Sequence, residues 1–315
     1  MIARRALPLL ALPFVARAAS WPEHPVRFVV PFSAGGGTDL LARALATPLS
    51  QLLGQPFVVE NRAGAAGSVG SEMVSRATDG HTILMGHVGT LAVNPSLYRL
   101  GYDPIGGLVP VSEVAVVPNL LVVNPEKVPA RSIAELIALA TARPGMPYGS
   151  SGNGSISHTA MAAFAYAAGI EVTQVPYRGT GPLVSDLLSG QVEMTFTGIT
   201  TLLPHVQGGG LRALGVSTTM RAPLLPEVPT IAETLPGFEV VQWQGVVASA
   251  GTPDAVVLRL NGAIAEALRA PEVERRLREE GAIAAPSTPA AFAALIRTEM
   301  DRWAQVVRAT GLKVE

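Results

Sequence analysis

Three loops rich in glycine and hydroxyl residues follow apolar stretches and precede helical patterns. They read "PFSAGGGTD" (31–39), "YGSSGNGSISH" (148–158) and "PYRGTGP" (176–182). Glycine lets a backbone turn its N–H groups toward a ligand, and the positive end of the following helix attracts negative charge. Each loop therefore predicts a binding site for an anion. Two or three largely neutral loops suit a carboxylate better than a nucleotide.

Nucleotide motifs are missing from these loops. No Walker pattern with its lysine occurs, and "SAGGGTDL" lacks the third glycine of a dinucleotide fingerprint. A tight turn followed by a helix cap also explains any single loop. Asp39 fits a capping role, or it receives the ammonium group of an amino-acid ligand. His158 is either a ligand contact or a buried hydrogen-bonding histidine.

Two alternatives to a simple binding protein are a serine hydrolase and a metal-binding receptor. An exported serine hydrolase would use Ser151 or Ser155 with His158, but no G-x-S-x-G elbow surrounds either serine and no orienting acid is evident. The five histidines are scattered without metal-ligand spacing, and the chain has no cysteine. We therefore expect a binding protein with no catalytic residues, no metal and no cofactor.

Composition narrows the class of protein further. The chain has 315 residues, of which 48% are hydrophobic and 15% charged, which is enough to fill the cores of two domains. Lys and Arg total 23 against 24 Asp and Glu. This balance leaves no basic surface for nucleic acid, so we expect no nucleic-acid partner.

The N-terminus "MIARRALPLLALPFVARAAS" has the layout of a secretory signal peptide. Two arginines precede a short apolar run, and small residues follow it. The run is shorter than the roughly 20 residues that a membrane-spanning helix needs. We expect residues 1–18 to be a cleaved signal peptide and the mature protein to be periplasmic.

Apolar runs alternate with helical patterns along the rest of the chain. This alternation predicts an α/β protein with parallel sheets. Pro48 is expected to kink or shorten the helix that follows the first loop. Without a flexible linker, the strands "NLLVVNPE" and "VVQWQGVVASAGTP" are candidates for joining two domains. We predict a discontinuous domain 1 (19–121 plus 243–315) and a domain 2 (122–242).

Several longer motifs resemble one family in order and spacing. They include "PFSAGGGTD", "VVENRAGAAGSVGSEMVSRATDGHTIL", "VNPSLY", "YGSSGNGSISH", "VPYRGTGPLVSDLLSGQVEMTF" and "LPEVPTIAETLPGFEVVQWQGVVASAGTP". The chain, from about Trp21 onward, resembles the Bug family of extracytoplasmic solute receptors of tripartite tricarboxylate transporters. The resemblance implies a type II two-lobed periplasmic binding protein with hinge-linked sheets of parallel or mixed strands. It also implies a monomer that closes on a small carboxylate (a di- or tricarboxylate, an acidic amino acid or an aromatic acid). The role is then uptake through TctA- and TctB-like membrane subunits, or sensing.

The resemblance also implies which residues bind the ligand. The first loop and the opposing serine loop hold one carboxylate, and further residues form the walls. The implied set is Phe32, Ser33, Ala34, Gly35, Gly36, Gly37, Asp39, Thr90, Ser150, Asn153, Gly154, Ser155, His158, Tyr177, Gly179, Thr197, Gly198 and Trp243. His87 and Arg178 depart from the family pattern, so either residue would alter recognition of the far end of the ligand if it reaches the pocket.

Overall fold

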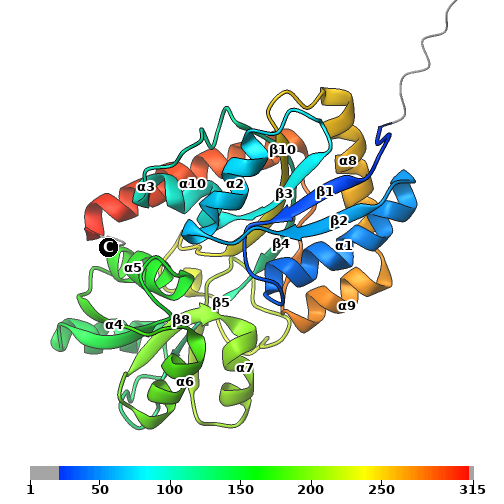
Figure 1. Cartoon of the computed structure of the whole chain (residues 1–315). Helices are drawn as coiled ribbons and strands as arrows, with labels where there is room; N and C mark the ends of the chain where they lie inside the picture. The colour runs from blue at the N-terminus through cyan, green and yellow to red at the C-terminus, as the bar shows by residue number, and fades with distance from the viewer. Residues whose placement is uncertain (1–20, 312–315) are drawn as a thin grey trace, which may run out of the picture.

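The computed structural model describes residues 21–311, which form two lobes, one above the other in Figure 1. The expected signal peptide lies outside the described residues. Within them, no helix is long and apolar enough to cross a membrane. Each lobe is built on one β-sheet with helices on both faces, an α/β arrangement.

The first lobe contains a six-stranded sheet in the order β11-β4-β10-β3-β1-β2. β1, β2 and β3 are parallel, but β10 runs antiparallel to both of its neighbours. The strands are β1 (Val26–Val30), β2 (Phe57–Asn61), β3 (Thr82–His87), β4 (Leu108–Val117), β10 (Gln242–Ser249) and β11 (Ile283–Ala284).

The second lobe contains a five-stranded sheet in the order β7-β6-β8-β5-β9. Here β5 is the strand that runs antiparallel to both of its neighbours. The strands are β5 (Asn119–Val123), β6 (Met146–Ser150), β7 (Val172–Pro176), β8 (Met194–Gly198) and β9 (Arg212–Val216). Both sheets are therefore mixed, and alternation of strands and helices alone did not predict their antiparallel strands.

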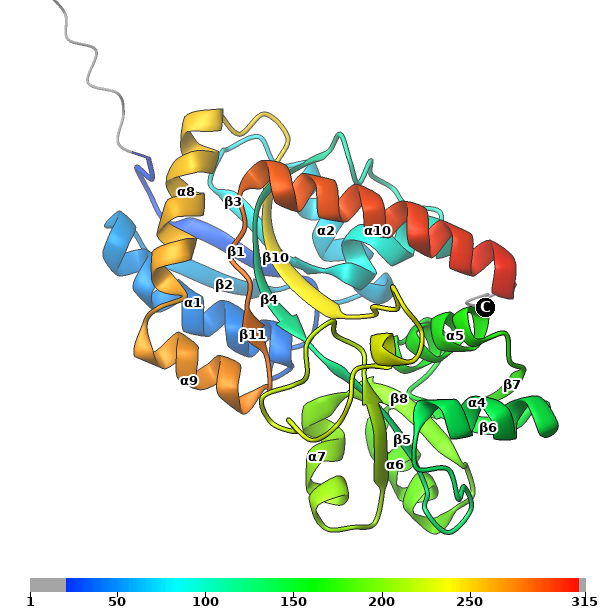
Figure 2. The ribbon, with the colours of Figure 1, turned by 180° about the vertical axis from the view of Figure 1, so that it is seen from behind.

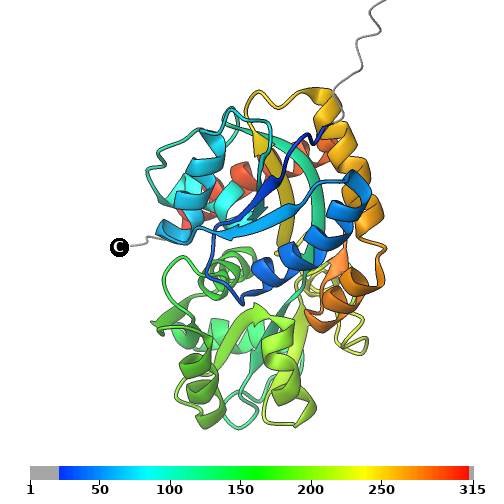
Figure 3. The same ribbon diagram turned by 45° about the vertical axis from the view of Figure 1, so that its right-hand side comes forward.

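The chain passes between the lobes twice, and Figure 3 shows both passages in the waist of the molecule. It leaves the first sheet at the end of β4 and enters the second with β5, so only Pro118 lies between the sheets. It returns with β10. The predicted domain boundaries, after residue 121 and before residue 243, lie next to these passages. The passages are joined side by side, because Gln242 Nε2 donates to Asn119 Oδ1 at 2.9 Å and Asn119 Nδ2 donates to the Val240 carbonyl at 2.8 Å.

Helices cover both faces of each sheet (Figures 1 and 2). In the first lobe these are α1 (Gly37–Leu53), α2 (Ser68–Ser75), α3 (Asn94–Leu97), α8 (Asp254–Ala267), α9 (Pro271–Glu279) and α10 (Pro289–Thr310), with short turns η1 (Ala65–Gly67) and η2 (Gly89–Val93). In the second they are α4 (Ile133–Ala142), α5 (Ile156–Ala168), α6 (Thr180–Ser189), α7 (Ile199–Gln207) and η3 (Ile231–Glu233). Pro48 lies inside α1, which continues to Leu53 rather than ending at the proline.

One apolar core extends from the first lobe into the second. It contains Leu84 of β3 and Trp243 of β10 together with Phe164 of α5 and Phe196 of β8, all at most 1% exposed. α10 belongs to the first lobe, yet it packs against α5 of the second, as Figure 2 shows. The lobes are therefore joined by packed side chains as well as by backbone.

Candidate ligand-binding site

A cleft of about 300 Å³ lies between the two lobes. Its residues come from the ends of β1 and β3, from η1, η2 and α3, and from the start of α5 and β10. The lining consists of Phe32, Ala66, His87, Val88, Gly89, Val93, Asn94, Tyr98, Asn153, Gly154, Ser155, Ile156, Thr159 and Gln242. Lysine, arginine, aspartate and glutamate are absent from this lining of described residues. A ligand here meets neutral donors and apolar walls.

The second lobe contributes the N-terminus of α5. Ser155 caps this helix: its Oγ accepts from the His158 amide at 3.4 Å and donates to the Gly152 carbonyl at 2.7 Å. Within residues 21–311, the amides of Ile156 and Ser157 have no hydrogen-bond partner. Free amides at a helix N-terminus attract an anion, because the helix dipole adds to the hydrogen bonds.

The same geometry does not assemble a serine nucleophile. Ser151 Oγ lies 3.1 Å from Ser157 Oγ, and Ser155 Oγ uses its proton on Gly152. His158 Nδ1 instead accepts from the Gly154 amide at 3.1 Å. Across residues 21–311 no imidazole nitrogen bonds to either serine, so no general base activates a hydroxyl here. His158 is 8% exposed, and burial lowers its pKa.

The first lobe contributes a stacked aromatic pair. The rings of Phe32 and His87 are 4.5 Å apart between centroids and inclined by 8°. Two glycines permit this packing. A Cβ on Gly67 would lie 3.1 Å from the Phe32 ring and 2.4 Å from Thr90 Cγ2, and a Cβ on Gly89 would lie 2.4 Å from the His87 ring. Any side chain at either position would displace the pair.

The rest of the first glycine loop lies outside the cleft lining. Ser33, Ala34, Gly35, Gly36 and Gly37 connect β1 to α1 without lining the cleft. The side chain of Glu280 lies 3.2 Å from the position of a Cβ on Gly37. A carboxylate therefore already lies close to the start of α1, where it disfavours a second anion.

Asp39 holds this loop together from within. Its carboxylate accepts from the Gly35 amide at 2.8 Å, from Arg43 Nε at 3.0 Å and from Asn61 Nδ2 at 2.9 Å. Burial alone would raise the pKa of Asp39, but these hydrogen bonds outweigh it and keep the pKa below its ordinary value. Asp39 is 1% exposed. Its oxygens are thus used by the protein, and it does not receive a ligand ammonium in this arrangement.

Other predicted residues lie near the cleft. Thr90 supports His87, because its Oγ1 accepts from the His87 amide at 3.1 Å. A Cβ on Gly198 would lie 3.4 Å from Gln242 Nε2, so Gly198 lies against the cleft floor; Thr197, next to it in β8, is 5% exposed. Ser150 lies behind the serine loop, where its Oγ accepts from Gln174 at 2.7 Å.

Four residues singled out from the sequence lie away from the lining. Tyr177 donates to Asp186 Oδ2 at 2.8 Å, Gly179 caps α6, and Arg178 between them is exposed. Trp243 is fully buried and packs edge-on against Phe292, with ring centroids 5.6 Å apart. The placement of Trp243 in the cleft wall is therefore corrected: this strand position faces the core of the first lobe.

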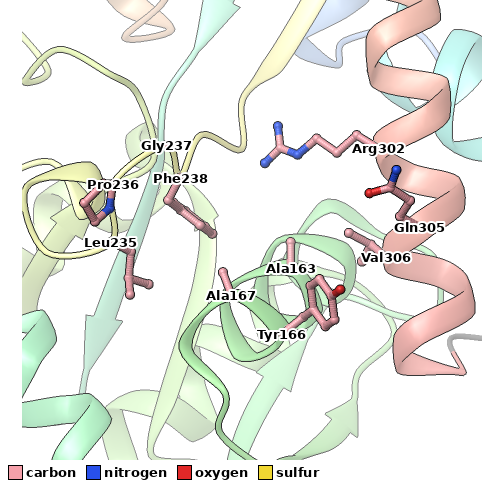
Figure 4. Close-up of a pocket in the computed structure, with 10 residues that line it drawn as sticks. All are labelled: Ala163, Tyr166, Ala167, Leu235, Pro236, Gly237, Phe238, Arg302, Gln305 and Val306. Atoms are coloured by element: carbon pink, nitrogen blue, oxygen red, sulfur yellow. The ribbon is translucent and has the colours of Figure 1, made fainter.

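A second hollow, of about 420 Å³, opens where α5 and the loop 235–238 face α10 (Figure 4). In Figure 4 Arg302 extends from α10 into the space between this helix and the loop that carries Phe238. Arg302 is paired with the buried Glu299 at 3.1 Å. Its charge is already compensated, so this hollow is a poorer anion site than the cleft.

Comparison with known proteins decides between the remaining interpretations. Residues 41–312 match the model of the tripartite tricarboxylate transporter family receptor. The chain belongs to this family. It is similar to the protein BugT of Bordetella pertussis, with 39% identity over 95% of this chain and 93% of that protein. The resemblance drawn from the motifs is therefore confirmed.

Solved structures of other receptors share the fold. A Rhodopseudomonas palustris protein solved with adipate is 39% identical, with a TM-score of 0.77 over 93% of this chain and 99% of the other. MatC from Rhodopseudomonas palustris, solved with malate, is 34% identical, with a TM-score of 0.74 over 91% of this chain and 100% of the other. The periplasmic binding protein BugD is also 34% identical, with a TM-score of 0.74 over 93% of this chain and 99% of the other. The hydrolase alternative finds no support among these relatives.

The receptor also shows cleft residues that the sequence did not single out. Ala66 has a φ of 51°, a left-handed conformation that is unusual for alanine, and its carbonyl accepts from Asn94 Nδ2 at 2.9 Å. Strained backbone is frequent at functional sites. Ala66 lies in the run "RAGAAGS", and Asn94 and Tyr98 lie in the motif "VNPSLY". Nothing in either motif indicates that these residues meet Gln242 around one cleft.

Proposed function

We propose that this protein is an extracytoplasmic receptor that captures a small carboxylate between its lobes. One observation carries the proposal: the partner-free amides at the start of α5, beside Ser155, lie in a cleft without acidic side chains. Hydrogen bonds from such donors to a carboxylate contribute on the order of 1.5–3 kcal/mol each. The carboxylates bound by relatives agree with this assignment.

The remaining parts of the assignment are proposals of the same kind. Residues 1–18 are a cleaved signal peptide, and the mature chain is a periplasmic monomer of two domains that meet at the passages beside Pro118 and Gln242. Closure of the lobes creates a surface that membrane subunits of a tripartite transporter, or a sensor, then recognise.

Ser155→Ala tests the binding site. We expect the affinity for the bound carboxylate to fall roughly tenfold, because the substitution removes one hydroxyl at the site and loosens the cap that orients the free amides. The cost in unfolding free energy should be about 1 kcal/mol. Titration calorimetry on protein purified from the periplasm of an expression host, after denaturation and refolding to remove carried ligand, measures the affinity.

Ser132→Ala is the matched control. Ser132 caps α4 in the same lobe by accepting from the Glu135 amide at 3.1 Å, but it does not line the cleft. Its loss should cost similar stability and leave the affinity unchanged. Equal affinities in the two variants would remove the α5 terminus from the site.

A further inference from the structure

His87 presents a single fixed hydrogen-bond donor to the cleft. Its Nδ1 accepts from the Gly89 amide at 2.7 Å and lies 3.4 Å from the Thr90 amide. An acceptor at Nδ1 requires the ring to be neutral with its hydrogen on Nε2. Burial lowers the pKa of His87 to about 4, which agrees with this assignment. Within residues 21–311, Nε2 of His87 takes part in no hydrogen bond.

The wall around His87 is apolar. Phe32 lies flat against the ring, and Val88, Val93 and Tyr98 complete this side of the cleft. The side-chain amide of Asn94 donates to the Ala66 carbonyl and is not available to a ligand. The first lobe thus offers aromatic and aliphatic surface with neutral polar atoms, whereas the second lobe offers the helix terminus. The two walls suit the two ends of one amphipathic molecule.

We infer that the cleft is selective for a monocarboxylate with an apolar, ring-shaped body, and that the His87–Phe32 pair determines this selectivity. The inference rests on the proposed function and narrows its ligand. The carboxylate lies at the start of α5, the ring lies against the aromatic pair, and Nε2 of His87 donates to a neutral acceptor or to π-electrons of the ligand.

A second carboxylate finds no compensating charge at this wall. Burying an ionised group without a charged partner or several donors is unfavourable. His87 stays neutral, and Arg178, in the loop that precedes α6, is exposed and outside the lining. A dicarboxylate would therefore leave one end poorly solvated, while a ring would bury apolar surface against Phe32, Val93 and Tyr98.

The experiment compares four acids by titration calorimetry on refolded, ligand-free protein. Benzoate and cyclohexanecarboxylate carry one carboxylate on a ring, and adipate and malate carry two on a chain. We expect at least one ring acid to bind about tenfold more tightly than either dicarboxylate. Mass spectrometry of the protein before refolding identifies any carried ligand, which should be a ring-containing monocarboxylic acid.

Three variants assign the selectivity to the pair. His87→Asn retains an acceptor for the Gly89 amide, because an asparagine oxygen two residues before an N–H makes the same turn. It should fold normally and lose the preference for ring acids, with their affinity reduced about tenfold. His87→Ala should lose the preference as well. Arg178→Ala, the control, should keep the wild-type order.

The outcomes separate the inference from the function on which it rests. If adipate or malate binds more tightly than both ring acids, or if His87→Asn keeps the ring preference, the inference is overturned while the receptor function stands. A dicarboxylate found bound to the protein as purified would overturn the inference in the same way. If none of the four acids binds and no carboxylate is carried, both the inference and the proposed function fail.

Discussion

His87 in the first lobe and His158 in the second are held in the same way but used differently. Each accepts a hydrogen bond at Nδ1 from a glycine amide, Gly89 at 2.7 Å and Gly154 at 3.1 Å. Burial lowers the pKa of both. His87 lines the cleft and stacks on Phe32, whereas His158 is 8% exposed and does not line it.

The difference shows how a fixed tautomer serves two purposes. At His158 the bond braces the serine loop that precedes α5. At His87 the equivalent bond braces η2 and also determines which ring nitrogen can donate to a ligand. Position relative to the cleft, rather than local chemistry, decides whether such a histidine takes part in recognition.

Replacing either histidine by alanine should lower stability, and the larger loss is expected at His158. His158→Ala should lower the unfolding free energy by about 2–3 kcal/mol, because it opens a buried space and leaves the Gly154 amide without its acceptor. His87→Ala should cost about 1 kcal/mol, since its ring is partly open to the cleft. Urea unfolding followed by circular dichroism measures both. Equal costs would show that the two histidines do not differ as bracing groups.

The pH dependence of stability tests the neutral state of both rings. A histidine with a lowered pKa binds fewer protons in the folded than in the unfolded state, so its contribution is complete above the unfolded pKa of about 6.5 and is lost as the pH falls toward the folded value. For His87 this window extends down to about 4. We expect a loss of up to about 3 kcal/mol across it, reduced in His87→Ala. Unfolding curves at a series of pH values measure this, and an unchanged pH slope in the variant would contradict a neutral His87.

Glu113 changes the pH dependence of stability in the opposite direction to His87. Replacing it therefore isolates the contribution of the histidine. Burial and the nearby carboxylates of Glu239 and Glu299 raise the pKa of Glu113 to about 7. The folded state then binds more protons, so stability is lost as the pH rises from about 4.5 to 7.

Glu113→Gln should therefore raise the unfolding free energy by about 1 kcal/mol near pH 8 and have little effect near pH 4.5. Thermal and urea unfolding at the two pH values measure the change. The exposed Glu126→Gln serves as the control and should shift neither value. A stabilisation that is equal at both pH values would exclude titration of Glu113 as its cause.

Much of the fold was predictable from the sequence, because apolar runs and their spacing report directly on strands and helices. The strands at 26–30, 57–61, 82–87 and 119–123 coincide with the apolar runs "VRFVV", "FVVEN", "TILMGH" and "NLLVV" of the sequence. β4 was not predicted, since "LVPVSEVAVV" mixes proline and polar residues with its valines. The antiparallel direction of β5 and β10 depends on how the chain returns between lobes, which local patterns do not record.

The site was predictable only in part. The serine loop was recognised because its glycines, hydroxyls and following helix are contiguous, and Asn153, Gly154 and Ser155 do line the cleft. Trp243 was placed in the site by the family resemblance, which does not tell which face of β10 meets the cleft in this chain. Ala66, Tyr98 and Gln242 come together only through tertiary packing.

The bond between Asn119 and Gln242 has a mechanical consequence for the waist of the molecule. Two independent single-strand connections would leave the lobes with several rotational degrees of freedom. Because these hydrogen bonds hold the two connections side by side, the pair bends readily about one axis and resists torsion. Rotation of one lobe against the other is therefore favoured about this one axis, which would keep the two halves of the cleft in alignment.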